Sequence, residues 1–259
     1  SLSHEGPDLV TYIGDTKPGF DEIIARAPEG KVEMVAGCHR YWYRGNWKHQ
    51  LDNLVDALHT PAAHASTIHP DGMQFSRRPS EEGQQAPFFD EKGEPVVMYL
   101  GINAYPYGHS SGESMFPGEQ RGGAWEEYRE IMLKKYGGDS KKVRDVMKQK
   151  IHSLTLFPTF DLLTVQNAVR VIIPKSVDYT EVRIYPMRMK GAPEELFAED
   201  LLYCGLAHSA TSFVQTDDVE SFRRVQDGLA TQGNDWCLIA RGLKREKWNN
   251  RGVGYGNRS

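Results

Sequence analysis

Two histidines in the first quarter of the chain have a spacing that could bring both to one metal ion. His59 and His64 stand five residues apart, and Asp56 lies three residues before His59. On an unbroken helix a spacing of five turns two side chains about 140° apart, which is too far for one ion. Pro61 lies between the histidines and changes the course of the backbone, so a histidine at a helix end and one in the next loop can converge. Asp56 would then orient the His59 ring.

A two-histidine site of this kind needs a carboxylate as its third ligand. Two histidines and one carboxylate leave coordination positions open on non-haem Fe(II) for dioxygen and substrate. The candidate segment is Asp217-Asp218-Val219-Glu220, and spacing does not choose among its three acids. Both halves of the site have a plainer explanation, because acids cap helix starts and histidines with aspartates are typical of a solvated helix face.

Alternating strands and helices must position these residues. The apolar period predicts a helix from Asn46 to about Thr60, which ends before Pro61, and another from Asp217 to about Gly228. Further helices are expected at 124–136, at 141–151 and after Pro193, and strands at 32–43 (broken at Gly37), 96–105, 153–160, 162–173 and 180–189. The first thirty residues look irregular, and 70–94 look like a loop. Strands with few crossover helices indicate an antiparallel sheet with helices packed on it, an α+β fold in one domain.

Composition narrows the classes of function. The 259 residues include 31 basic and 35 acidic side chains, a net charge of −4, which argues against a general nucleic-acid-binding protein. No run of about 18 apolar residues is present, so no membrane span is expected. The N-terminal residues have no basic or apolar region typical of a signal peptide. Three isolated cysteines (Cys38, Cys204 and Cys237) form no metal-binding or disulfide pattern, so we expect a reduced, cytoplasmic chain.

The residues around the two histidines also resemble a known motif. In Rieske non-haem iron oxygenases, the large (alpha) subunits of aromatic-ring-hydroxylating dioxygenases, the pattern is NWK-x3-EN-x2-D-x-YH-x4-H. This chain has Asn46-Trp47-Lys48, Asp52-Asn53, Asp56-Ala57-Leu58-His59 and His64. Downstream, the segment from Asp217 to Phe222 resembles the family's DD-x-EN-W, and that from Val225 to Leu229 its IQ-x-GL. The segment from Pro7 to Gly14 and the Phe157-Pro158 pair are weaker matches.

The resemblance implies roles for particular residues. His59, His64 and Asp218 would ligate a mononuclear Fe(II), and Asn53 would lie close to the iron without binding it. Asp56 would bridge an iron-bound histidine to a Rieske-cluster histidine of a neighbouring subunit and would carry or gate the electron. The implied fold is helix-grip (START/Bet v1-like), a curved antiparallel sheet around a long helix, with additional helices.

Several family features differ or are missing in this sequence. Asp52 replaces a glutamate, Leu58 stands where tyrosine is common, and Ser221-Phe222 replace Asn-Trp. The cluster-binding motifs Cys-x-His and Cys-x2-His are both absent. We therefore expect residues 1–259 to be a single mononuclear-iron catalytic domain. The Rieske [2Fe-2S] cluster is expected on an N-terminal domain absent from this chain, which is a fragment or a natural subunit that receives electrons from another chain.

The resemblance further implies the reaction and the partners. The protein would add one or both atoms of dioxygen to an aromatic substrate, with electrons from a ferredoxin or reductase, and would form a homotrimer or an alpha3beta3 assembly when intact. Candidate pocket residues are Asn53, Leu58, His109, Phe157, Phe160 and Leu162. Such residues are also typical of plain core and loop positions.

Two other classes of function remain open at this point. A non-catalytic module for hydrophobic ligands on the same fold would hold no stoichiometric iron. A zinc hydrolase could use His59, His64 and Asp218, since zinc accepts the same ligands, although no HExxH-like general base is present.

Overall fold

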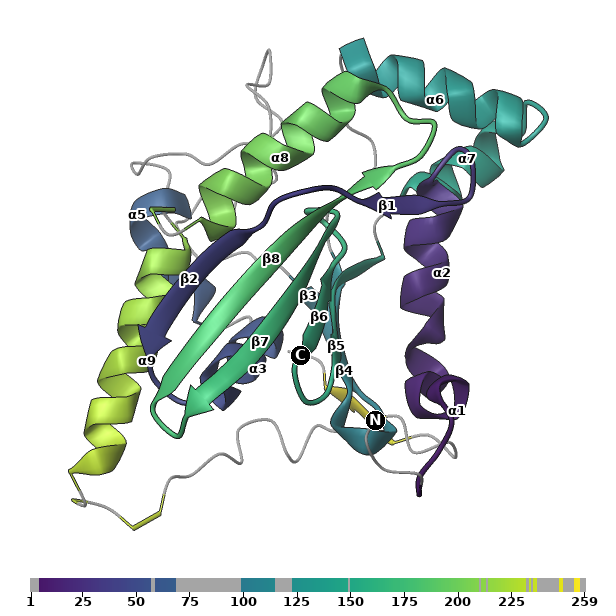
Figure 1. The fold of residues 1–259 in the computed structure, drawn as a ribbon. Helices are drawn as coiled ribbons and strands as arrows, with labels where there is room; N and C mark the ends of the chain where they lie inside the picture. Colours follow the sequence, from purple (N-terminus) through teal and green to yellow (C-terminus); the bar gives the residue numbers. More distant parts are fainter. Residues whose placement is uncertain are drawn as a thin grey trace, which may run out of the picture.

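The computed structural model describes residues 5–56, 59–68, 99–114, 123–148, 150–209, 211–212, 214–231, 233, 235–236, 247–248 and 254–256 (Figure 1). Within these residues ten strands form one antiparallel sheet, in the order β1-β8-β7-β6-β5-β4-β3-β10-β9, with β2 also paired to β8. The strands are β1 (Val32–Met34), β2 (His39–Arg44), β3 (Tyr99–Ala104), β4 (Ser110–Ser114), β5 (Ile151–Leu156), β6 (Phe160–Leu163), β7 (Ala168–Ser176), β8 (Tyr179–Met189), β9 (Lys247–Trp248) and β10 (Gly254–Gly256).

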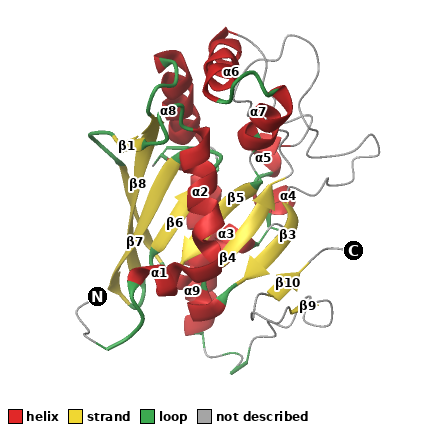
Figure 2. Ribbon diagram, turned by 90° about the vertical axis from the view of Figure 1, so that its right-hand side faces the viewer, coloured by secondary structure: helices red, strands yellow, loops and turns green. Residues whose placement is uncertain are grey.

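Helices cover both faces of this sheet. They are α1 (Leu9–Ile13), α2 (Lys17–Arg26), α3 (Lys48–Val55), α4 (Thr60–Ala63), α5 (Ala65–Ile68), α6 (Gly123–Lys135), α7 (Ser140–Met147), α8 (Glu194–His208) and α9 (Gln215–Ala230), with short 3-10 turns at Gly14–Thr16 and Pro106–Gly108. Helices α8 and α9 lie along one side of the sheet, and α1 and α2 lie on the other (Figures 1 and 2). None of the described helices combines the length and apolar character needed to cross a membrane.

Successive side chains of a strand point to opposite faces of the sheet, so each face has its own buried cluster. Leu163 of β6 belongs to a buried cluster with Leu54 of α3, Cys204 of α8 and Phe222 of α9. Its neighbour Leu162 points to the opposite face and packs in a cluster with Ile23 of α2. The face toward α3, α8 and α9 is therefore distinct from the face toward α2.

Most predicted elements are confirmed. The α+β class and the antiparallel sheet agree with expectation, and the break at Gly37 is real because this glycine has φ 96° between β1 and β2. The break lets β1 and β2 pair in succession along the single long strand β8.

Three predictions are wrong in detail. The first thirty residues are mostly helical: the Asp8 side chain caps α1 by accepting the Thr11 N–H, and a proline occupies the first turn of α2, where it is tolerated. The segment 162–173 is two strands with a turn, and Asn167 in that turn has φ 47°. The helix expected from Asn46 to Thr60 ends at Val55, because Asp56 is extended, and Pro61 lies in the first turn of the new helix α4.

Candidate metal centre

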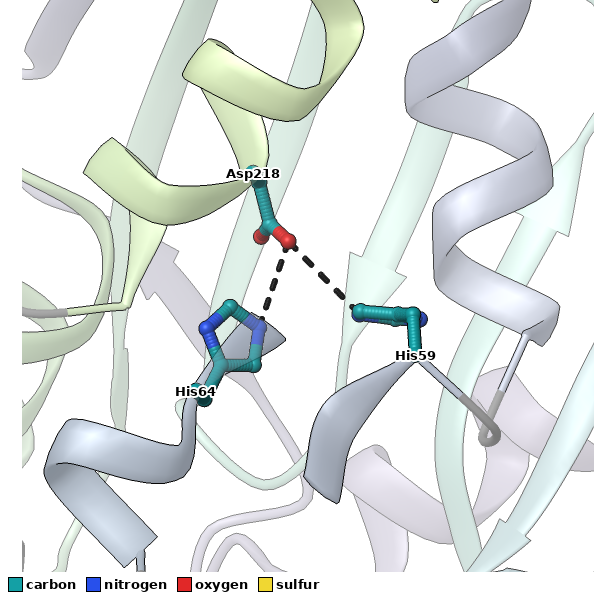
Figure 3. Close-up of side chains that lie close together, drawn as sticks. All are labelled: His59, His64 and Asp218. Atoms are coloured by element: carbon teal, nitrogen blue, oxygen red, sulfur yellow. Dashed lines mark ion pairs between the residues drawn. The ribbon is translucent and has the colours of Figure 1, made fainter. Parts of the chain in front are cut away.

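Three side chains from two distant parts of the chain converge at the end of α4 and the start of α9. His59 immediately precedes α4, His64 immediately follows it, and Asp218 lies in the first turn of α9 (Figure 3). Asp218 Oδ1 lies 3.2 Å from His64 Nε2 and 3.6 Å from His59 Nε2. One ligand atom from each residue lies within 4.8 Å of the other two. The arrangement offers two imidazole nitrogens and one carboxylate oxygen to a single point.

The short helix α4 brings the histidines together. It is one turn long, so His59 and His64 flank it, and their ring centroids are 5.4 Å apart. The proline in its first turn fits because a proline there removes no helical hydrogen bond. The sequence predicted that the backbone changes direction at Pro61 and continues as a loop. The structure has the change of direction, but the chain continues as a second helix.

The outer nitrogen of each histidine ring faces a carboxylate. His59 Nδ1 is 3.7 Å from Asp56 Oδ2, and His64 Nδ1 is 3.3 Å from Asp217 Oδ2. A carboxylate at Nδ1 favours a proton there and leaves Nε2 free to bind a metal. The partner of His64, Asp217, is a role that spacing did not single out.

The third acid of the segment, Glu220, faces elsewhere. Its two carboxylate oxygens accept hydrogen bonds from Arg223 and Arg224, each 2.8 Å long. Among the three acids that spacing left open, Asp218 is the one whose carboxylate lies between the histidines.

Asn53 of α3 contacts two of the three converging side chains. Its Nδ2 lies 3.0 Å from His59 Nε2 and 2.9 Å from Asp218 Oδ1. Because an amide nitrogen only donates, His59 Nε2 must accept, and the ring proton lies on Nδ1 toward Asp56. The hydrogen bonds therefore hold His59 in the tautomer that a metal ligand requires.

Electrostatics around the histidines favour a cation. Burial by itself lowers the pKa of His64, but hydrogen bonds to Asp218 and Asp217 and their negative charges outweigh it and raise that pKa. His64 and Asp218 are 3% and 6% exposed. The carboxylates that stabilise a positive charge on His64 would also stabilise a divalent ion bound between these side chains.

Comparison with known proteins identifies the family of this chain. The family model for the ring hydroxylating alpha subunit (catalytic domain) matches residues 31–243. The chain belongs to this family. The large subunit of 2-halobenzoate 1,2-dioxygenase from Burkholderia cepacia is 22% identical over 243 residues, 93% of this chain and 50% of that protein. Toluate 1,2-dioxygenase subunit alpha from Pseudomonas putida is 26% identical over 249 residues, 94% of this chain and 51% of that protein.

Solved structures support the fold of this chain. Naphthalene 1,2-dioxygenase with indole bound in its active site superposes with a TM-score of 0.73 at 18% identity, over 98% of this chain and 57% of that one. This likeness establishes the α+β fold. The chain spans about half the length of the curated relatives it matches.

One candidate pocket residue, His109, has its ring bonded to backbone groups, and another, Phe157, packs against an aromatic ring. His109 places Nε2 2.8 Å from the Tyr12 carbonyl oxygen, and its Nδ1 accepts from the Phe157 N–H at 3.0 Å. Both ring nitrogens are therefore occupied. The ring of Phe157 packs beside Trp47, with centroids 5.9 Å apart.

Of the remaining pocket candidates, two lie on the sheet face toward α2 and one lies outside the described residues. Phe160 stacks on Phe20 of α2 at 6.2 Å, and Leu162 also packs toward α2, so neither is brought to the metal ligands. Leu58 lies outside the described residues. The alternation of strand side chains explains this placement, because Leu163 rather than Leu162 faces α3.

Sequence reasoning missed several buried polar residues on the face toward α3 and α9. They are Gln50, Asp161, Arg170 and Gln215. One pattern could have pointed to two of them: Gln50 stands three residues before Asn53, and Gln215 three before Asp218. On a helix, this spacing extends the same face by about one turn.

Proposed function

We propose that this chain is the catalytic domain of an aromatic-ring-hydroxylating oxygenase, in which His59, His64 and Asp218 hold a mononuclear iron. The observation that carries the proposal is the convergence of their ligand atoms within 4.8 Å. Two imidazoles and a carboxylate suit Fe(II) and leave its other positions open. When bound, the iron would supply the redox chemistry that activates dioxygen. Residues 1–259 form one catalytic domain in this proposal.

The surrounding residues set the proton positions and the hydrogen bonds of the ligands. Asp56 and Asp217 keep the protons of His59 and His64 on Nδ1, so both Nε2 atoms stay available. The Asn53 amide, which lies against both His59 and Asp218, must turn away from at least one of them when that atom binds a metal. His64 and Asp218 are buried, which limits the access of water to their side of the site, whereas the His59 side chain is 23% exposed.

The overall reaction adds one or both oxygen atoms to an aromatic ring. Adding both atoms of dioxygen consumes two electrons and two protons for each substrate. The relatives described above are named for aromatic substrates, 2-halobenzoate and toluate, and we extend the aromatic class to this protein. Cytoplasmic ferredoxin or reductase partners would supply the electrons.

Electrons must enter from a centre outside this sequence, because it contains no Cys-x-His or Cys-x2-His motif. We propose a Rieske [2Fe-2S] cluster on another domain or chain as the donor, within a trimer or an alpha3beta3 assembly. Asp56 is the residue for this transfer, because its side chain is 35% exposed and also reaches His59.

Metal content tests the proposal. Wild type and the variants His59→Ala, His64→Ala and Asp218→Ala are purified anaerobically, reconstituted with Fe(II) and analysed for iron and zinc. His39→Ala is the matched control, because His39 lies on β2 and is not one of the three ligands. We expect near-stoichiometric iron in wild type and control and loss of iron in the three variants.

Each other outcome contradicts the proposal. Zinc that is lost with the same variants would indicate a hydrolase. No metal in any protein would indicate a binding module. Iron retained by all three variants would overturn the ligand assignment.

A further inference from the structure

One buried arginine connects the sheet with the helix that carries Asp218. Arg170 of β7 is 2% exposed, and its side chain reaches two helices. Its Nη2 donates to His208 Nδ1 at 3.2 Å and to Gln215 Oε1 at 3.4 Å. This nitrogen carries two hydrogens, so it serves both acceptors at once. A single guanidinium group therefore holds one residue from each helix.

The two acceptors of Arg170 lie at the facing ends of successive helices. His208 is the last residue of α8 and Gln215 is the first residue of α9, so only residues 209–214 lie between them. Ser212 in this connection is buried, and its hydroxyl accepts the Gln215 N–H at 2.8 Å. Helices α8 and α9 lie along the same side of the sheet (Figure 1). Arg170 therefore fixes, from the sheet, the point at which α9 begins.

The first turn of α9 is also where the carboxylate ligand lies. Asp218 is three residues after Gln215, a rise of about 4.5 Å along the helix. Asp217, whose carboxylate faces His64, belongs to the same turn. Residues of one helical turn share a hydrogen-bonded backbone, so a shift of Gln215 moves both aspartates with it. The two histidines come from a distant part of the chain, so their separation from Asp218 depends on where α9 begins.

The ionisation of the neighbouring groups suits these contacts. Burial and the charge of Arg170 hold the pKa of His208 well below its usual range, so the ring is neutral and its Nδ1 accepts. Asp161 stands directly opposite Arg170 in the β6–β7 pairing. Burial raises the pKa of Asp161 to about 7, although the charge of Arg170 acts in the opposite direction. Asp161 therefore supplies part of the counter-charge of the arginine.

This buried arginine contributes a defined geometry rather than stability. The Nε and Nη1 atoms of Arg170 and both carboxyl oxygens of Asp161 have no hydrogen-bond partner among the described residues. A buried charge with incomplete hydrogen bonding is unfavourable, and well-packed apolar residues often stabilise a core more. Hydrogen bonds are directional, however, so the two bonds from Nη2 select one arrangement of the helix ends.

We propose that Arg170 is a positioning residue for the metal centre, acting through Gln215 on the place of Asp218. This inference rests on the proposed function, because it concerns the same set of ligands. Arg170 binds no metal itself. It holds the start of α9 so that the carboxylate of Asp218 lies between the two histidine rings.

Metal affinity of matched variants on α9 tests the inference. Gln215→Leu removes the acceptor, whereas Gln215→Glu keeps an oxygen toward Arg170. Gln226→Leu is the matched control, because Gln226 Oε1 also accepts a hydrogen bond, from the Asn46 N–H at 2.9 Å, but lies about three turns further along the helix. In a chelator competition with the intact protein, Gln215→Leu should weaken Fe(II) binding about 10-fold. Gln226→Leu should bind as wild type does, and Gln215→Glu at least as tightly.

Two further measurements separate positioning from a general loss of stability. The absorption spectrum of the Co(II)-loaded protein reports the geometry of the ligands, and it should change in Gln215→Leu but not in Gln226→Leu. Arg170→Lys keeps the charge but loses the planar group, so it should weaken Fe(II) binding as Gln215→Leu does. The double variant should lose little more than either single one, because both changes break the same link.

The remaining outcomes overturn this inference or the proposed function. Iron bound by wild type with unchanged affinity in Gln215→Leu refutes this inference alone, and so do equal losses in Gln226→Leu or additive losses in the double variant. If Arg170→Lys does not fold, the variants of Gln215 decide. Zinc is titrated in parallel: a protein that binds zinc but not iron refutes the proposed function and still tests the place of Asp218, since zinc accepts the same ligands. A protein that binds neither metal refutes both.

Discussion

Asp161 is a fully buried carboxyl group on β6, and its replacement by asparagine tests how far burial controls its protonation. Burial raises its pKa from the ordinary value of 3.8 to about 7, even though the charge of Arg170 acts in the opposite direction. Between these two values the folded protein keeps a proton that the unfolded chain has lost. The stability from this proton is fully present below the unfolded pKa and is lost as the pH rises through the folded pKa.

The expected size of the effect follows from the two pKa values. A rise from 3.8 to about 7 corresponds to about 4 kcal/mol, at about 1.4 kcal/mol for each pH unit. Asparagine cannot titrate, so Asp161→Asn lacks this loss. The attraction of Arg170 for an ionised Asp161 is already included in the folded-state pKa of about 7, so its loss in the variant adds no separate pH dependence. From about pH 4 to 8 the free energy of unfolding should therefore shift by about 4 kcal/mol in favour of the variant.

Urea unfolding of both metal-free proteins, followed by tryptophan fluorescence at a series of pH values and constant ionic strength, measures this difference. Metal is removed first because a bound ion would add its own pH dependence. Leu162→Val, on the same strand, changes packing without a titrating group and should differ from wild type by a constant amount. If Asp161→Asn also differs from wild type by a constant amount at every pH, burial does not raise this pKa and the reasoning is wrong.

Three further substitutions give distinct outcomes. Asp56→Asn should keep iron but slow electron arrival in the intact enzyme, and normal steady-state turnover would contradict the proposed transfer role. Asp217→Asn should weaken iron binding about 10- to 100-fold in a chelator competition, because it removes the carboxylate at His64 Nδ1, and unchanged affinity would contradict this role. Met132→Ala empties a fully buried position on α6 and should lower the free energy of unfolding by about 2–5 kcal/mol in urea, whereas a loss below about 1 kcal/mol would show that the core collapses around the cavity.

Local patterns were sufficient to predict most of the fold. Strand composition with Gly37 as a break predicted β1 and β2, and apolar periodicity predicted α6 and α9. The turn between β6 and β7 was missed because its residues are buried and include apolar ones, so they continue the strand pattern. The helix α2 was missed because a proline and a glycine near its start favour an irregular segment.

The site was predictable only in part, for a physical reason. His59 and His64 are close in the chain, so their spacing carries information, whereas Asp218 was singled out only through the family resemblance. Arg170 could not be anticipated, because an arginine in an alternating strand normally indicates a solvent-exposed face. Here helices cover both faces of the sheet, so Arg170 is buried although its side chain is charged.

The order of the strands has a consequence for how the protein matures. Strands β5 to β8 follow one another in the chain and pair with their sequence neighbours, so these hairpins close short loops. The contact between His64 and Asp217 joins residues 153 positions apart, and closing that loop has a larger entropic cost. We therefore expect the hairpins of β5 to β8 to form before α9 docks against α4. A newly made chain in which only these hairpins have formed has no complete ligand set, because His59, His64 and Asp218 have not yet come together.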